Sequence, residues 1–71
     1  MAHKTVNIII NGFEEPVPMG STIDDLIRQF GEGDVDLIVE RNGRFVYPQK
    51  YGEIVVEKGD RVEFINPNFG G

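Results

Sequence analysis

Residues 5–17, TVNIIINGFEEPV, place two runs of strand-forming residues on either side of an Asn-Gly pair. The first run is dominated by β-branched residues, which favour strands. Asn11-Gly12 is the dipeptide best suited to the left-handed positions of a two-residue hairpin turn. Pro16 and Pro18 close the second run, because proline cannot donate a hydrogen bond to a sheet. The stretch therefore predicts a β-hairpin with strands at Thr5–Ile10 and Phe13–Val17.

A short amphipathic helix is predicted after this hairpin. Ser21-Thr22 offers a hydroxyl cap. Asp24 and Asp25 place carboxylates in the first turn, where the helix dipole favours them, and one of the two is positioned for a capping box. Gly31 ends the helical pattern. The apolar residues recur at helical spacing and predict a stripe that packs on a sheet: Ile23, Leu26, Ile27 and Phe30.

The second half of the chain returns to strands. Asn42-Gly43 forms a second tight turn between two predicted strands, and Pro48 stops the second of them. Ile54–Val56 is a short apolar segment, and Gly59-Asp60 belongs to a turn before the last strand. The strands predicted in this half are Val35–Arg41, Arg44–Tyr47 and Arg61–Ile65.

This order of elements predicts an α+β domain. Because the first and last strands flank all the other elements, pairing them in the centre of the sheet is the compact solution, with a right-handed crossover through the helix. The expected fold is a ubiquitin-like β-grasp, a mixed sheet of about five strands with one helix packed on one face. We assign residues 1–66 to this domain and residues 67–71 to a flexible C-terminal tail that ends in Gly70-Gly71.

Size and composition narrow the classes of function. The chain has 71 residues, a formal net charge of −5 and no cysteine. The acidic balance argues against binding to nucleic acid or to an anionic membrane. The lack of cysteine excludes disulfides, thiolate zinc sites and a cysteine nucleophile. No apolar run is long enough to cross a bilayer, so we expect a cytoplasmic protein. We also expect the protein to be monomeric when free.

The sequence offers little for catalysis or metal binding. Three carboxylates cluster within residues 32–36, but they lack the spacing and the closing glutamate of a calcium loop. His3 is the only imidazole and has no evident partner for a triad or a zinc site. We therefore expect no metal site, no bound cofactor and no enzyme activity of its own.

Apolar residues on the open face of the sheet are candidates for partner binding. Successive side chains of a strand point to opposite faces, which predicts that Ile9 and Ile65 lie away from the helix. In the third strand Leu37 and Val39 oppose Ile38, so one of these two sets joins that face. Such residues can form a docking surface, or they can be scattered singly, as is common on soluble proteins. Ile9, Ile38 and Ile65 are the predicted docking residues.

Several motifs together resemble the small sulfur-carrier proteins of the ThiS/MoaD family, over essentially the whole chain. The compact spacing of the motifs in this chain and its single short helix are more similar to the ThiS members, of thiamine biosynthesis, than to the longer MoaD members, of molybdopterin synthesis. The motifs are Ile10-Asn11-Gly12, Thr22-Ile23-Asp24-Asp25-Leu26-Ile27, Arg41-Asn42-Gly43-Arg44-Phe45-Val46, Gly59-Asp60 and Gly70-Gly71.

The resemblance implies a function for Gly71. In this reading an E1-like adenylyltransferase uses Mg-ATP to adenylate the Gly71 carboxylate. A persulfide from a cysteine desulfurase or a rhodanese-type donor then replaces AMP, and the resulting thiocarboxylate donates sulfur within an acceptor enzyme such as thiazole synthase. Gly70 and Gly71 have no Cβ and suit a narrow active site, and Pro67 favours departure of the tail from the sheet.

The tail also departs from the family pattern, and other readings remain open. Phe69 stands where small or aliphatic residues are usual, so it is either an anchor in a partner's channel or a sign of a different acceptor. The sulfur could go to thiazole, molybdopterin, an amino acid or tRNA. A ubiquitin-like protein modifier and a non-covalent β-grasp interaction domain are the rival functions.

Overall fold

The computed structural model describes residues 4–31 and 36–67 and shows one mixed sheet with one α-helix. A 3₁₀-helix, η1, was not predicted. In chain order the elements are β1 Thr5–Ile10, β2 Phe13–Pro18, α1 Ile23–Phe30, β3 Ile38–Arg41, β4 Arg44–Val46, η1 Pro48–Lys50 and β5 Arg61–Ile65.

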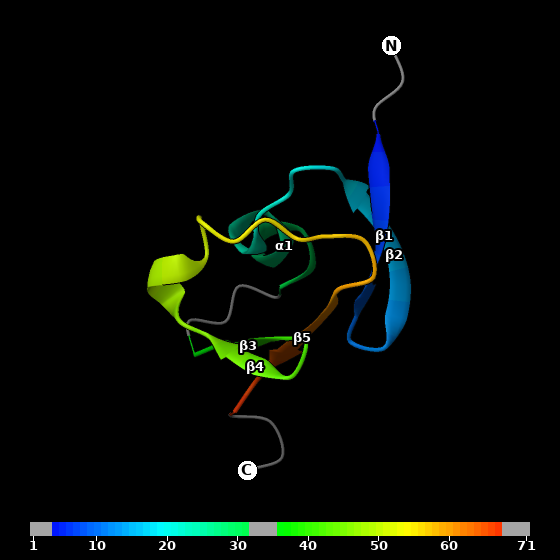
Figure 1. The fold of residues 1–71 in the computed structure, drawn as a ribbon. Coiled ribbons are helices and arrows are strands. Elements are labelled where there is room, and N and C mark those ends of the chain that lie inside the picture. Colours follow the sequence, from blue (N-terminus) through cyan, green and yellow to red (C-terminus); the bar gives the residue numbers. More distant parts are fainter. Residues whose placement is uncertain (1–3, 32–35, 68–71) are drawn as a thin grey trace.

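The strands follow the order β2-β1-β5-β3-β4 across the sheet. β1 and β5 pair in parallel at its centre, and all other pairs are antiparallel. The sheet curves around α1, which lies against its inner face (Figure 1). The prediction that the first and last strands meet in the centre is confirmed, as is the single helix on one face.

Both Asn-Gly pairs form the predicted hairpin turns. Asn11 and Gly12 have φ angles of 50° and 87°, and Asn42 and Gly43 have φ angles of 53° and 82°. Asparagine and glycine tolerate this left-handed backbone better than other residues, and two successive positive φ angles match the twist of a hairpin. The two turns fix the registers of the β1–β2 and β3–β4 pairs.

The helix begins with a complete capping box. The Thr22 hydroxyl accepts a hydrogen bond from the Asp25 backbone N–H, and the Asp25 carboxylate accepts one from the Thr22 N–H. The hydrogen bond from the Thr22 backbone N–H is the main cause that lowers the pKa of the Asp25 carboxyl group, followed by the Thr22 side chain and the charge of Arg28. At the C-terminal end of the helix, a Cβ on Gly31 would lie only 2.6 Å from the Ile27 carbonyl oxygen, so only a residue without a Cβ fits this C-cap position without a shift. The structure thus assigns the cap to Thr22 and the capping box to Asp25.

The core lies between α1 and the inner face of the sheet. Ile23 and Leu26 on the helix are 0% and 1% exposed. The buried core residues are Ile8, Ile10, Val17, Ile23, Leu26, Val39, Val46, Val56 and Val62. The Ile54–Val56 segment makes only one β-bridge, between Val55 and Thr22, and covers the N-terminal end of the helix.

The predicted third strand was too long. β3 begins at Ile38, whereas Leu37 lies outside the ladder and Asp36 in a turn; Val35 is outside the described residues. The register explains this start, because Ile38 pairs with Ile65, the last residue of β5. No β5 residue remains to pair with Leu37.

The predicted fourth strand was too long by one residue, and the second was too short by one. β4 ends at Val46, and Tyr47 becomes the N-cap of η1, whose first residue is Pro48. Proline has a φ angle suited to the first turn of a helix and no N–H to lose there. In the second strand, Pro18 still pairs with Thr5, on the outer edge of the sheet where a missing N–H is tolerated.

Candidate functional site

The register places all three predicted docking isoleucines on the outer face of the sheet, away from α1. Ile9 lies between Ile8 and Ile10, which are both buried on the helix side. Ile65 follows Phe64, which packs against the core, and Ile38 precedes the fully buried Val39. The alternative left open for the third strand is resolved in favour of Ile38.

These three isoleucines do not form one patch. Ile38 and Ile65 are directly opposite each other in the β3–β5 pair, and Ile65 is 38% exposed. Ile9 instead pairs with Glu14 on β2 and with Arg61 on β5. A polar stretch of β5 therefore separates Ile9 from the Ile38–Ile65 pair.

Two aromatic residues extend this outer face beyond what the sequence analysis singled out. Phe45 pairs with Glu40 and so shares its face, and as residues Phe45 and Tyr47 are 51% and 63% exposed. Their rings make an edge-to-face contact with centroids 4.8 Å apart. Alternation around the buried Val46 was the signal that could have identified them.

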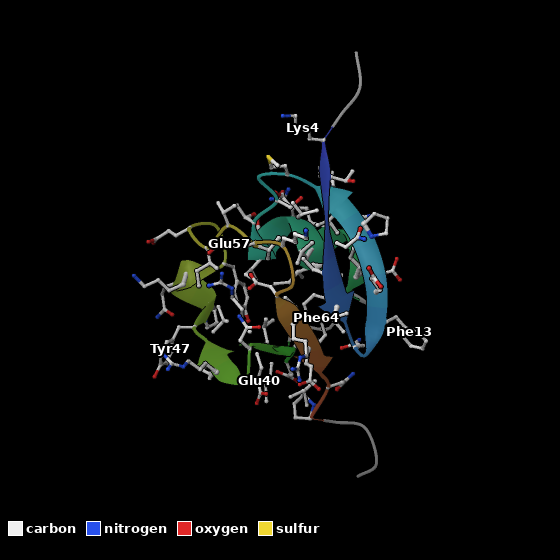
Figure 2. All side chains as sticks on the ribbon, turned by 45° about the vertical axis from the view of Figure 1, so that its right-hand side comes forward. Lys4, Phe13, Glu40, Tyr47, Glu57 and Phe64 are labelled. Atoms are coloured by element: carbon white, nitrogen blue, oxygen red, sulfur yellow. The ribbon has the colours of Figure 1, made fainter. Side chains whose placement is uncertain are left out.

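The outer face also carries two glutamates from neighbouring strands. Glu40 on β3 is directly opposite Glu63 on β5. Figure 2 shows Glu40 on the side of β3 away from the helix, with Tyr47 at the same end of the sheet. The β4-β3-β5 half of the sheet therefore carries the two glutamates, the two aromatic rings and the Ile38–Ile65 pair.

The C-terminal end of β5, which leads into the tail, is tied to the first hairpin. The Phe64 backbone N–H donates to the Asn11 side-chain oxygen at 2.8 Å, which ties β5 to the first hairpin. Pro67 is exposed two residues after β5 ends. The predicted covalent site, Gly71, and the predicted contacts Phe69 and Gly70 lie outside the described residues.

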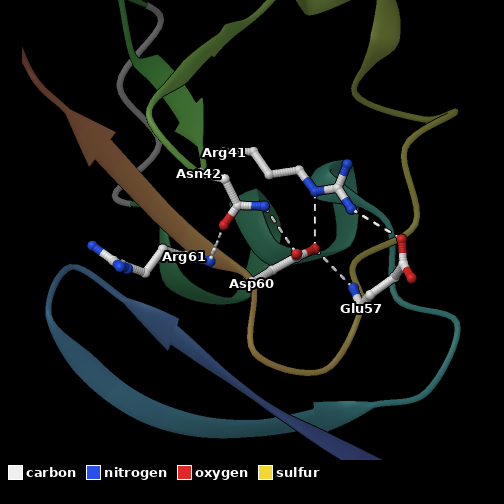
Figure 3. Close-up of polar contacts among 5 residues, drawn as sticks. All are labelled: Arg41, Asn42, Glu57, Asp60 and Arg61. Carbon is white, nitrogen blue, oxygen red and sulfur yellow. Dashed lines mark hydrogen bonds and ion pairs between the residues drawn. The ribbon is translucent and has the colours of Figure 1, made fainter.

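A polar cluster around Asp60 fixes the beginning of β5 (Figure 3). The Asp60 carboxylate, 8% exposed as a residue, accepts hydrogen bonds from the Arg41 Nε at 2.9 Å, the Asn42 side-chain nitrogen at 3.0 Å and the Glu57 backbone N–H at 2.8 Å. The Asn42 side-chain oxygen in turn accepts from the Arg61 N–H at 2.8 Å. This cluster joins the second hairpin to the central strand.

The same contacts control the ionisation of Asp60. Burial by itself would raise the pKa of this carboxyl group, but the hydrogen bonds from Asn42, Glu57 and Arg41 and the charge of Arg41 outweigh it and lower the pKa. Elsewhere, burial raises the pKa of Tyr51. The ionised Asp60 is thus a structural anion, satisfied by its neighbours.

The described part of the chain contains no group of three His, Asp or Glu side chains arranged to hold a metal ion. Within residues 4–31 and 36–67, no helix has the length and apolarity to cross a membrane.

Comparisons with known proteins identify the family. A search of curated proteins found no match. Among solved structures, the thiamine biosynthesis protein (ThiS) from Geobacter metallireducens is similar, with a TM-score of 0.80 and 25% identity over 93% of this chain and 100% of that chain. The β-grasp fold is thereby confirmed. A family model described as the ThiS family matches residues 3–71, which include both the sheet and the Gly-Gly end. The chain therefore belongs to the ThiS family.

Proposed function

We propose that this protein is a sulfur carrier for thiamine biosynthesis and that Gly71 carries the sulfur as a thiocarboxylate. The observation that carries the proposal is the family match, which runs through the final Gly-Gly pair. The similar solved structure is named as a thiamine biosynthesis protein, which supports the thiazole of thiamine as the destination. In this role the protein is a co-substrate of its partners and binds no cofactor itself.

The anchored end of β5 suits this role. Asn11 and the Asp60 cluster hold the two ends of the central strand, and the strand stops at Ile65. Residues 67–71 can span at most about 17 Å when extended. A partner that docks on the outer face near Ile65 can therefore receive Gly71 in an active site at that distance. Gly70 and Phe69 would contact the walls of the partner's channel.

Activation would follow the usual chemistry of a carboxylate. A Gly71 carboxylate oxygen attacks the α-phosphorus of Mg-ATP, bound by an E1-like partner, and pyrophosphate leaves. The terminal sulfur of a donor persulfide attacks the acyl-adenylate carbon and expels AMP. A second donor thiol then attacks the inner sulfur, which forms a donor disulfide and releases the Gly71 thiocarboxylate. The absence of cysteine from this chain leaves no internal thiol to compete.

The outer face supplies the docking surface in this proposal. Ile65 lies on the strand that leads into the tail, and Ile38 is directly opposite it on β3, so contact with this pair would align the tail with the partner's active site. Ile9 lies further along the face, beyond Arg61, and would contact the edge of a partner. An activating enzyme and a thiazole synthase would use this face in turn, because one tail cannot enter two active sites at once.

Intact-mass spectrometry tests the function directly. The purified chain is incubated with Mg-ATP, the E1-like enzyme and cysteine desulfurase of its own organism, and cysteine. We expect exchange of one oxygen for one sulfur at Gly71. A chain lacking Gly71 and one extended by alanine should both remain unmodified, whereas the control variant Lys58→Ala should react normally. Normal modification of the extended chain would exclude Gly71 as the site.

A second measurement tests the destination of the sulfur. The thiocarboxylate form is added to thiazole synthase with its small-molecule substrates, and the thiazole product is analysed for sulfur from a labelled carrier. Labelled thiazole supports the thiamine assignment. Unlabelled thiazole from a carrier that does form the thiocarboxylate would retain the carrier function and reject this acceptor.

A further inference from the structure

One row of side chains on the outer face combines two like charges with an aromatic ring. Phe45 on β4 is opposite Glu40 on β3, and Glu40 is opposite Glu63 on β5. Side chains in directly opposite positions start about 5 Å apart. We call these three residues the acidic-aromatic row. Its carboxylates are therefore neighbours on one open surface.

The two glutamates have no partner within the described chain. Across residues 4–31 and 36–67, neither Glu40 nor Glu63 makes an ion pair or a side-chain hydrogen bond. Arg61, two residues before Glu63 on the same face, does not pair with either of them. Like charges directly opposite each other destabilise a strand pair. The fold thus keeps two carboxylates side by side that no ion pair within the described chain neutralises.

Apolar and aromatic side chains lie beside this row on the side away from Arg61. Phe45 begins the row, and Tyr47 contacts it edge to face. The Ile38–Ile65 pair lies two residues along the strands on the same face. A cation that binds here would meet carboxylates and exposed rings together, a setting that favours a guanidinium over a compact ammonium.

We propose that the acidic-aromatic row binds an arginine side chain of the activating partner. A planar guanidinium has five N–H donors and can bridge both carboxylates while one face lies on an aromatic ring. The identity of the partner rests on the proposed function, but the preference for a guanidinium rests on the row alone. The row would contribute to the choice of partner, and the isoleucine pair would contribute apolar contact.

A peptide probe tests the preference without any enzyme. ¹⁵N-labelled protein is titrated with acetyl-Leu-Arg-Leu-amide, and separately with peptides that have citrulline or lysine in place of arginine. We expect the arginine peptide to shift the amide signals of Glu40, Phe45 and Glu63. Citrulline has nearly the same shape without the charge, so its peptide should bind about tenfold more weakly or not at all.

Matched variants separate this row from general acidity. Glu40→Gln/Glu63→Gln should reduce the affinity for the arginine peptide about tenfold, because the bridged charge is lost. Glu53→Gln is the control, since Glu53 is an exposed glutamate that pairs with Lys50 away from the row. The double variant should also weaken binding to the E1-like partner and lower the salt dependence of that binding.

Several results would overturn the proposal. One is equal binding of the arginine and citrulline peptides, and another is equal binding of arginine by the double variant. Preference for the lysine peptide would reject the guanidinium. Dilution-dependent shifts of the same amides, with a dimer in sedimentation, would show that a second copy covers the face. None of these measurements requires sulfur transfer, so failure here is distinguishable from failure of Gly71 to accept sulfur.

Discussion

The two faces of the same sheet are built from alternate residues of the same strands, yet they differ in what covers them. On the inner face Ile8, Val39 and Val62 are completely buried beneath α1. On the outer face lie their neighbours in sequence, Ile9, Ile38, Glu40 and Glu63, and no helix packs there in the described chain.

This contrast separates residues that fold the domain from residues that can recognise a partner. A buried aliphatic side chain contributes both transfer free energy and close packing, so its truncation is costly. An exposed side chain contributes little to folding and remains free to contribute to binding. Substitutions should therefore affect folding from the inner face and recognition from the outer face.

The largest loss of stability is expected from Leu26→Ala. Leu26 is 1% exposed between the helix and the sheet, and truncation of such a residue costs roughly 2–5 kcal/mol. Urea unfolding monitored by circular dichroism would measure this loss. Ile65→Ala on the outer face is the matched comparison and should cost less than about 1 kcal/mol. Equal losses would remove the distinction between the faces.

The next effect is expected from Asp60→Asn. The amide keeps the shape of the side chain but loses the charge that accepts from Arg41 and Glu57, at a cost of about 1–3 kcal/mol. The lowered pKa of Asp60 means that its ionisation contributes stability above about pH 4 and that this contribution is lost as pH falls further.

The pH dependence gives a separate check on the same cluster. The difference in unfolding free energy between the wild type and Asp60→Asn should be constant near neutral pH and should shrink below about pH 4. Urea unfolding at several pH values measures it. A difference that grew on acidification would mean that the protonated carboxyl group is the stabilising form.

A smaller effect is expected at the helix start. Thr22→Ala removes the hydroxyl that accepts from the Asp25 N–H and should cost about 1 kcal/mol. Thr22→Ser retains the hydroxyl and is the control. If both variants lose the same stability, the contribution of Thr22 comes from its packing and not from the cap.

The smallest effect, and one of opposite sign, is expected on the outer face. Glu40→Gln relieves the repulsion with Glu63 and should leave the unfolding free energy unchanged or raise it by up to about 0.5 kcal/mol. Thermal unfolding at low salt is the sensitive measurement. A clear loss of stability would show that Glu40 has a structural role.

The sequence alone predicted the elements whose signals are local. Asn11-Gly12 and Asn42-Gly43 predicted both hairpins, since few other dipeptides tolerate two positive φ angles. The spacing from Ile23 predicted a helix that ends at Phe30. The start of β3 was missed because it depends on where β5 ends, a contact distant in sequence.

The candidate site was predictable in part for the same reason. Alternation was sufficient to place Ile9 and Ile65 on the outer face, because each strand by itself has a period of two. The juxtaposition of Glu40 with Glu63 depends on the register between two strands, which no local pattern specifies. The acidic-aromatic row therefore became visible only in the folded chain.

The most direct test of the separation between folding and recognition is the rate of Gly71 thiocarboxylate formation in Ile38→Ala/Ile65→Ala, followed by intact mass at limiting concentration of the E1-like partner. We predict a rate about tenfold below the wild type, because the central apolar contact of the docking surface is lost while the inner core remains intact. A rate equal to that of the wild type would contradict the account and place recognition elsewhere on the molecule.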